Sequence, residues 1–249
     1  MIALSVELAK MRRLKVWLVA AGIAAGTLLL ASMRLFSAAH RAAINDPATQ
    51  HWEGMLLFYA MVKAMTAPIL VAVLASRQVD IEHQGNGWAM AATLGQPRGR
   101  LCATKIAALA PVVAGVTVVE LGGLYAGSKL AGAALPVPAG PWWWYAAASF
   151  AVTMALLALH VLLAARVENQ LAGLGIGVLG AFAGVFVMLM PDWLARMLPW
   201  GYYAVVATHR MTPDGYAATP IAWPALALFL LVVAALVTAG LHLLDRTES

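Results

Sequence analysis

Long apolar stretches alternate with short polar ones along this chain. A helix needs about 20 mainly apolar residues to cross the hydrocarbon core of a bilayer. The stretches that meet this requirement are residues 15–33, 55–76, 105–127, 143–165, 171–190 and 221–244. The pattern therefore predicts an all-α integral membrane protein with six transmembrane helices. We expect residues 1–249 to form a single transmembrane domain.

Composition supports a membrane fold. Hydrophobic residues make up 63% of the chain and charged residues 11%, whereas soluble domains carry about 25% charged residues. A single cysteine, Cys102, excludes an internal disulfide and a multi-cysteine metal cluster. The net charge of +5 is not gathered on a basic face with interleaved aromatic residues, so we expect no nucleic-acid partner.

The basic residues predict the orientation, because lysine and arginine gather on the cytoplasmic side of membrane spans. If the chain begins in the cytoplasm, the cytoplasmic segments hold Lys10, Arg12, Arg13, Lys15, Arg77, Arg98, Arg100, Lys105, Arg166 and Arg246. The outer segments then hold only Arg34, Arg41, Lys129, Arg196 and Arg210. Both termini are therefore predicted to lie in the cytoplasm, with the first span acting as a retained signal anchor.

A polar segment, residues 77–105, separates the second and third spans. Residues 80–94 are predicted to form a short helix that begins with the acidic residues Asp80 and Glu82, as the helix dipole favours. Trp88 and Leu94 supply apolar contacts, and Pro97 follows the helix. A helix lying on anionic lipid would carry a basic polar face, so the acidic start favours a protein partner.

The outer segment 191–220 is too apolar for a solvated loop and too interrupted by proline to cross the membrane. We expect one or two short helices there, lying in the outer interface or re-entering the membrane. The aromatic and proline residues expected to form an outer gate or substrate region are Trp193, Pro199, Trp200, Tyr202 and Tyr203.

Two charged residues, Lys63 and Glu120, fall well inside spans at similar depth. A charge in lipid is costly unless it is paired or hydrated, so we expect the two to pair. The pair could line a substrate path or be a structural salt bridge, or the glutamate could be protonated. His160 is expected to be a structural histidine. Glycines of the fifth span are spaced for close helix packing, mainly within the subunit: Gly173, Gly175, Gly177, Gly180 and Gly184.

The polar segment resembles the first cytoplasmic loop of type-2 ABC exporter permeases. The residues that carry the resemblance are Glu82, Gly87, Trp88, Leu94, Pro97, Arg98 and Lys105. The Leu-Pro-Trp-Gly-Tyr run at 198–202 resembles the outer re-entrant region of the subgroup tied to lantibiotic immunity and bacitracin-type peptide export.

The resemblance implies a permease with no catalytic residues and no cofactor of its own. ATP and Mg²⁺ would bind a separate ATPase subunit, present in two copies, that docks on the 80–94 helix. Glu82 and Trp88 would be the main docking contacts, and Arg98 and Lys105 would anchor the loop. The full docking set would be Asp80, Glu82, Gly87, Trp88, Leu94, Pro97, Arg98 and Lys105. A second permease subunit, identical or a homologous sister, would complete the pathway in a bacterial cytoplasmic membrane. The cargo would be an antimicrobial peptide or another amphipathic compound, removed as self-immunity or resistance.

Three other functions remain open at the level of sequence. An integral membrane enzyme could use Lys63, Glu120 and His160, although the HExxH, GxSxG and GxxxxGKS motifs are absent from the sequence. A proton-coupled secondary transporter could use Glu120 as its proton carrier. A non-transporting anchor or sensor subunit would only position a partner. The loop resemblance favours the ABC permease over each of these.

Overall fold

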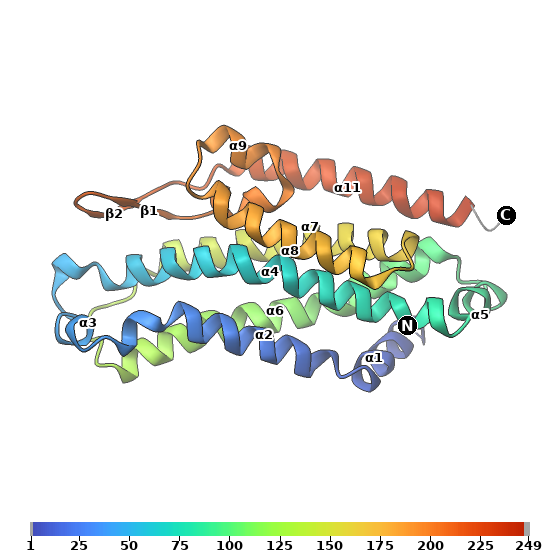
Figure 1. Cartoon of the computed structure of the whole chain (residues 1–249), viewed down its shortest axis with the longest axis horizontal. Helices are drawn as coiled ribbons and strands as arrows, with labels where there is room; N and C mark the ends of the chain where they lie inside the picture. Colours follow the sequence, from blue (N-terminus) through green and yellow to red (C-terminus); the bar gives the residue numbers. More distant parts are fainter. Residues whose placement is uncertain (1, 247–249) are drawn as a thin grey trace.

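The computed structural model describes residues 2–246 as a bundle of long helices that run side by side (Figure 1). The long helices are α2 (Val16–Ala31), α4 (His51–Gln84), α6 (Arg98–Leu130), α7 (Ala139–Arg166), α8 (Gln170–Val187) and α11 (Trp223–Arg246). The shorter helices are α1 (Ile2–Arg13), α3 (Ala38–Ala42), α5 (Gly87–Thr93), α9 (Asp192–Met197) and α10 (Tyr202–Val205). Two strands, β1 (His209–Thr212) and β2 (Gly215–Ala218), precede α11.

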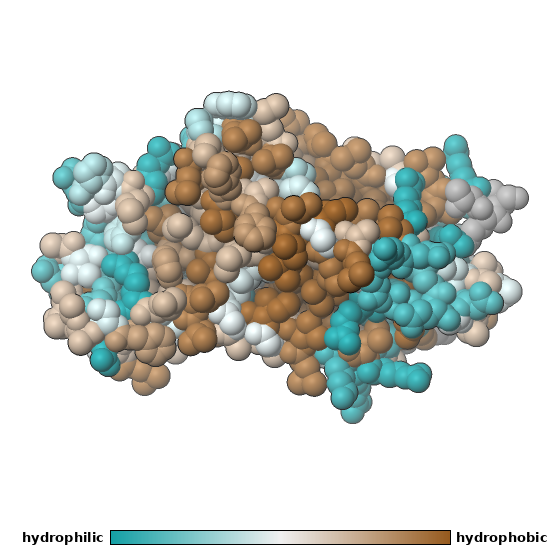
Figure 2. All heavy atoms as spheres, viewed as in Figure 1, coloured by the Kyte–Doolittle hydropathy of each residue, from teal (hydrophilic) through white to brown (hydrophobic). Residues whose placement is uncertain are grey.

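The six predicted spans correspond to these long helices. Within residues 2–246, five helices are long and apolar enough to cross a membrane, namely α4, α6, α7, α8 and α11. The sixth candidate is the pair α1 and α2, which meet at a bend of 63°. Figure 2 shows the corresponding apolar belt across the middle of the molecule, with hydrophilic residues gathered at the end where α1 and α5 lie. The all-α membrane fold is thus confirmed.

The two ends of the bundle differ in what they carry. The helix α1 and the last turns of α11 lie at the same end as α5, which we call the α5 end, and the strands and α3 lie at the other, the hairpin end (Figure 1). The helix α4 has 34 residues and connects the two ends.

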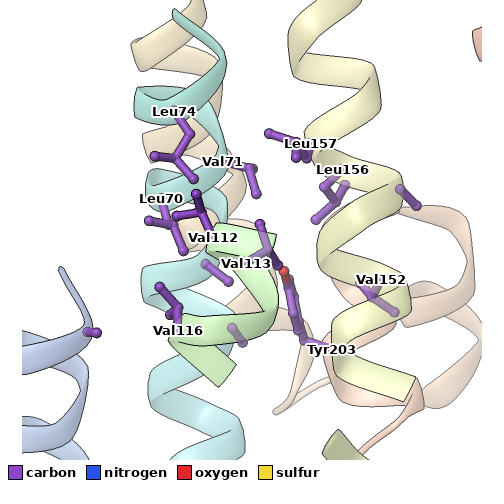
Figure 3. Packing of buried hydrophobic residues seen from close by; sticks show 14 of the residues in the cluster. Leu70, Val71, Leu74, Val112, Val113, Val116, Val152, Leu156, Leu157 and Tyr203 are labelled. Carbon is purple, nitrogen blue, oxygen red and sulfur yellow. The ribbon is translucent and has the colours of Figure 1, made fainter. Parts of the chain in front are cut away.

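The core lies around α4, which packs against α2, α7 and α8. Figure 3 shows leucine and valine side chains of α4, α6 and α7 meeting in the centre of the bundle, with Tyr203 of α10 among them. Glycines let α8 approach α4 closely: a Cβ at Gly177 would overlap the Cβ of Ala72, and one at Gly184 would lie 2.8 Å from the Ala64 carbonyl oxygen. Packing of these glycines within the subunit is therefore confirmed, whereas a Cβ at Gly173 or Gly175 would lie in open space in this chain.

A short helix does lie between the second and third spans, but the bounds predicted for it are wrong. Residues 80–84 belong to the end of α4, and α5 covers only Gly87–Thr93. The break occurs because Asn86 adopts a left-handed conformation with φ of 53° directly after Gly85. Pro97 stands outside α5 and precedes the first residue of α6.

The outer segment 191–220 contains the predicted short helices, α9 and α10, and also an antiparallel hairpin that the sequence reasoning missed. Thr212 pairs with Gly215, so Pro213 and Asp214 form the turn. Gly215 has a φ of +126°, which glycine adopts far more readily than other residues. The Pro-Asp-Gly run was the available signal, because it is a typical turn sequence between two strands.

Candidate functional site

Four charged side chains at the α5 end form a buried ion cluster, which we define as Glu7, Lys10, Glu82 and Lys105. The Nζ of Lys105 donates to Glu7 Oε2 at 2.7 Å and to Glu82 Oε1 at 2.6 Å. The Nζ of Lys10 donates to Glu7 Oε1 at 2.7 Å and to the same Glu82 Oε1 at 2.6 Å. Two cations thus balance two carboxylates, which compensates the cost of burying them.

The ion cluster joins three segments that are distant in sequence. Glu7 and Lys10 lie on α1, Glu82 near the end of α4, and Lys105 two turns into α6. Gln78, one turn before Glu82, donates its Nε2 to Glu7 Oε2 at 2.8 Å. The cluster, with Lys105 fully buried in it, fastens the end of α4, just before the loop that carries α5, to α1 and α6.

A second set of contacts fastens α5 itself. The Trp88 indole is buried; its Nε1 lies 3.3 Å from His83 Nδ1, and the Arg98 guanidinium lies 5.3 Å from its ring centroid. The other nitrogen of His83 lies 2.9 Å from the Ala164 carbonyl oxygen on α7. A Cβ at Gly87 would overlap the Glu82 carboxylate, so this position requires glycine.

These contacts correct the roles expected for Glu82 and Trp88. Both were predicted to face a partner, yet Glu82 is 3% exposed and Trp88 is 6% exposed. Glu82 instead binds the end of α4 to α1 and α6, and Trp88 packs α5 against His83 and Arg98. The side chains that α5 and its C-cap present outward are Met90, 65% exposed, and Leu94, 76% exposed. Asp80 is half-buried at the end of α4, so it belongs neither to the buried contacts nor to the outward-facing side chains.

Sequence reasoning missed Glu7, Lys10 and Gln78. Glu7 and Lys10 are three residues apart on α1, a spacing that lets them pair on one helix face, and this was the available signal. Nothing in the local pattern around Gln78 distinguishes it from the solvated polar residues that follow the second span.

The intramembrane pair is confirmed. Lys63 on α4 donates its Nζ to Glu120 Oε2 on α6 at 2.6 Å, and the Tyr59 hydroxyl donates to the same oxygen at 2.8 Å. Tyr145 on α7 packs edge-on against Tyr59, and its hydroxyl is buried without a hydrogen-bond partner. In the described part of the chain, no hydrogen bond or ion pair connects His160 to this pair, and no three His, Cys, Asp or Glu side chains gather to hold a metal ion.

Residues 3–184 match a family model described as ABC-2 family transporter protein. The chain belongs to this ABC-2 transporter family. No curated protein and no solved structure matched the chain. The matched range includes α1, α5, the ion cluster and the Lys63–Glu120 pair, and it ends within α8, before the outer segment and α11.

Membership of the ABC-2 family makes the chain a transporter membrane component that is not itself catalytic, and it implies association with an ABC ATPase and with a membrane. The polar segment between the second and third spans is where the sequence resemblance located the ATPase contact. In this ABC-2 family member, that segment carries α5, an exposed short helix held firmly by buried side chains.

The outer segment of this ABC-2 family member uses most of its predicted substrate residues for internal packing. Trp200 packs on Gly180 of α8, Tyr202 stacks on Phe229 of α11, and the Tyr203 hydroxyl lies 2.9 Å from Thr153 Oγ1. Pro199 begins the 3-10 turn between α9 and α10. Trp193, 63% exposed, is the member of this predicted set that faces outward.

Behind α9 and α10 lies a cavity of about 450 Å³ that sequence reasoning did not anticipate. Burial lowers the pKa of His209, which lies at its edge, and the opposing effect of Glu53 is smaller. A second cavity at the α5 end is lined by His83, Trp88 and Arg98. Neither of these two cavities is lined by Lys63, Glu120 or His160.

Proposed function

We propose that this chain is the permease subunit of an ATP-driven ABC exporter in a bacterial cytoplasmic membrane, with its α5 end in the cytoplasm. The excess of basic residues at that end supports the orientation. The exporter would contain two copies of the ATPase subunit, which bind ATP and Mg²⁺, and a second permease subunit that is identical or a homologous sister.

The observation that carries the proposal is the position of α5. This helix exposes Met90 and leaves Leu94 exposed at its end. Its buried Trp88 contacts α4 and α6, and the neighbouring Glu82 binds α1 and α6. A short helix that exposes apolar side chains and is held in place by buried contacts is suited to bind another protein and to transmit its motion. Exposed residues of this kind are typical anchors at interfaces.

The force would pass along α4. Its last turns hold Glu82 and Gln78 in the ion cluster, its middle holds Lys63, and its first turns contact the outer segment. A push on α5 by the closing ATPase dimer would therefore reach α10 and the outer cavity through one continuous helix. We propose that this motion releases an amphipathic compound, such as an antimicrobial peptide, as self-immunity or resistance.

The test is co-expression of this chain with the ABC ATPase expected to be encoded beside it. The double variant Met90→Asp with Leu94→Asp should lower ATPase co-purification at least tenfold, because two apolar contacts become charged. Thermal stability should change little, since both side chains are exposed. The matched control is Leu130→Asp, an exposed leucine at the hairpin end, which should leave co-purification unchanged.

ATP hydrolysis by the lipid-reconstituted complex, measured with and without an amphipathic peptide, tests the cargo separately. A complex whose hydrolysis responds to the peptide supports the peptide export proposal. A complex that ignores the peptide rejects this cargo and keeps the permease. No complex, or a complex that survives the double variant, contradicts docking on α5.

A further inference from the structure

The outer cavity has an apolar interior formed by elements from both halves of the chain. Leu57 and Met61 line it from α4, Met188 and Met190 from the turn after α8, and Val205 from α10. Its volume of about 450 Å³ falls within the range of about 300 to 1,000 Å³ that is usual for small-molecule sites. An amphipathic peptide is larger than a drug-sized ligand, so the cavity has room for a single apolar chain rather than for a whole peptide.

Four methionines contribute to this interior. Met61, Met188 and Met190 line the cavity together with Met211 of β1. The methionine side chain is unbranched, flexible and polarizable, so methionine-rich surfaces adapt to ligands of varying shape. Such a lining suits a flexible hydrocarbon chain better than a rigid ring system.

The rim of the cavity carries an excess of positive charge. Two arginines, Arg196 on α9 and Arg210 on β1, line the cavity with one carboxylate, that of Asp192, and Arg210 Nη2 lies 3.9 Å from Asp192 Oδ2. Arg210 also donates its Nε to Thr219 Oγ1 at 3.1 Å. Two guanidinium groups against one carboxylate favour an anionic group, and the guanidinium fork matches carboxylate and phosphate geometry.

We propose that this cavity binds a single-chain amphiphile with an acidic head group, taken from the membrane leaflet at the hairpin end. The hydrocarbon chain lies against the methionines, and the carboxylate or phosphate lies at Arg196 and Arg210. This inference deepens the export function and rests on it, because it names the class of compound that the exporter accepts.

The helix α10 separates the cavity from the core of the bundle. Ala204 and Val205 line the cavity, whereas the adjacent Tyr203 is fully buried on the other side, where it contacts Thr153 (Figure 3). Met61 lines the cavity two residues before Lys63 on α4. An occupied cavity thus touches both α10 and the helix that leads to α5.

The experiment uses the purified full chain in lipid nanodiscs without any ATPase. Two photoactivatable lysolipids with the same diazirine-bearing chain are compared, one with a phosphate head group and one with a phosphocholine head group. Mass spectrometry should locate the adducts on peptides that carry Met61, Met188 and Met211. The phosphate probe should label these peptides at least fivefold more than the phosphocholine probe.

Two variants and their matched controls decide the outcome. Ala204→Trp fills the cavity and should reduce labelling at least fivefold, whereas Leu236→Trp, on the exposed face of α11, should not. Arg196→Glu, an exposed change that spares the fold, should remove the preference for the phosphate probe, whereas Arg41→Glu at the same end should keep it.

Labelling spread evenly over the exposed faces of α8 and α11, or labelling that survives both Ala204→Trp and Arg196→Glu, overturns the proposal. Absence of adducts on these peptides with either lysolipid also overturns it. This labelling assay contains no ATPase, so a negative labelling result says nothing about docking on α5. In the same way, loss of ATPase binding says nothing about labelling of the cavity.

Discussion

Lys63 Nζ on α4 lies 2.6 Å from Glu120 Oε2 on α6, and each side chain is 1% exposed. The two residues are 57 positions apart in the chain, and Tyr59 contributes a further hydrogen bond to the same carboxylate oxygen. Each charge therefore has its counter-charge within hydrogen-bonding distance in the interior of the bundle. The pair fastens the central helix α4 to α6 at mid-depth.

A double-mutant cycle tests this pair. Lys63→Met should lower the free energy of unfolding by about 3 to 5 kcal/mol, because it leaves a buried carboxylate uncompensated. Adding Glu120→Gln should restore part of that loss, since the neutral amide needs no counter-charge. Denaturant titration of the detergent-solubilised chain measures the free energy of unfolding of each variant in the cycle. Losses that simply add would show that the two residues do not interact energetically.

The second prediction concerns Glu7 and the attachment of α1. Glu7→Ala removes the acceptor used by Lys10, Gln78 and Lys105 and leaves the buried Lys105 and the partly buried Lys10 against Glu82 alone. We expect α1 to detach from α6 and the chain to become more sensitive to trypsin at the exposed Arg12 and Arg13.

Limited proteolysis followed by mass spectrometry of the released N-terminal peptide measures this effect, and we expect cleavage to be at least tenfold faster than in the unmodified chain. Glu168→Ala is the control, because Glu168 is an exposed acid at the same end of the bundle. Equal cleavage rates in Glu7→Ala and Glu168→Ala would mean that the ion cluster does not hold α1.

The third prediction compares two glycines of α8 that are two residues apart. Gly177→Ala should cost about 1 to 3 kcal/mol, the usual cost of overpacking, because its Cβ would meet Ala72 and lie 3.0 Å from the Pro68 carbonyl oxygen. Gly175→Ala should instead stabilise the chain by about 0.5 to 1 kcal/mol, the usual gain of alanine over glycine in a helix.

Thermal unfolding of both variants in detergent measures whether each substitution raises or lowers the stability of the chain. A Cβ at Gly175 would lie in open space in this chain, so a loss of stability in Gly175→Ala would show that a second subunit packs on this face of α8. Equal effects at both positions would contradict the close approach of α8 to α4.

The sequence by itself determined the membrane class, the number of spans and the pairing of Lys63 with Glu120. Each follows from a strong constraint that acts locally: an apolar stretch long enough to cross a bilayer does so whatever its neighbours, and a charge in lipid needs a counter-charge at its own depth. The same reasoning located the polar segment that carries α5. The resemblance of this segment to a loop of ABC permeases then indicated the family of the chain.

Only the tertiary structure decided which polar residues are buried. Asp80 and Glu82 are two positions apart on the same helix, yet Asp80 is partly exposed and Glu82 is held by Lys10 and Lys105. Glu7 and Lys105 meet across 98 positions of sequence. Such a contact depends on how α1 folds back along α6, which no local pattern specifies. The outer cavity likewise depends on how α9, α10 and β1 lie against α4 and the turn after α8, which are distant in sequence.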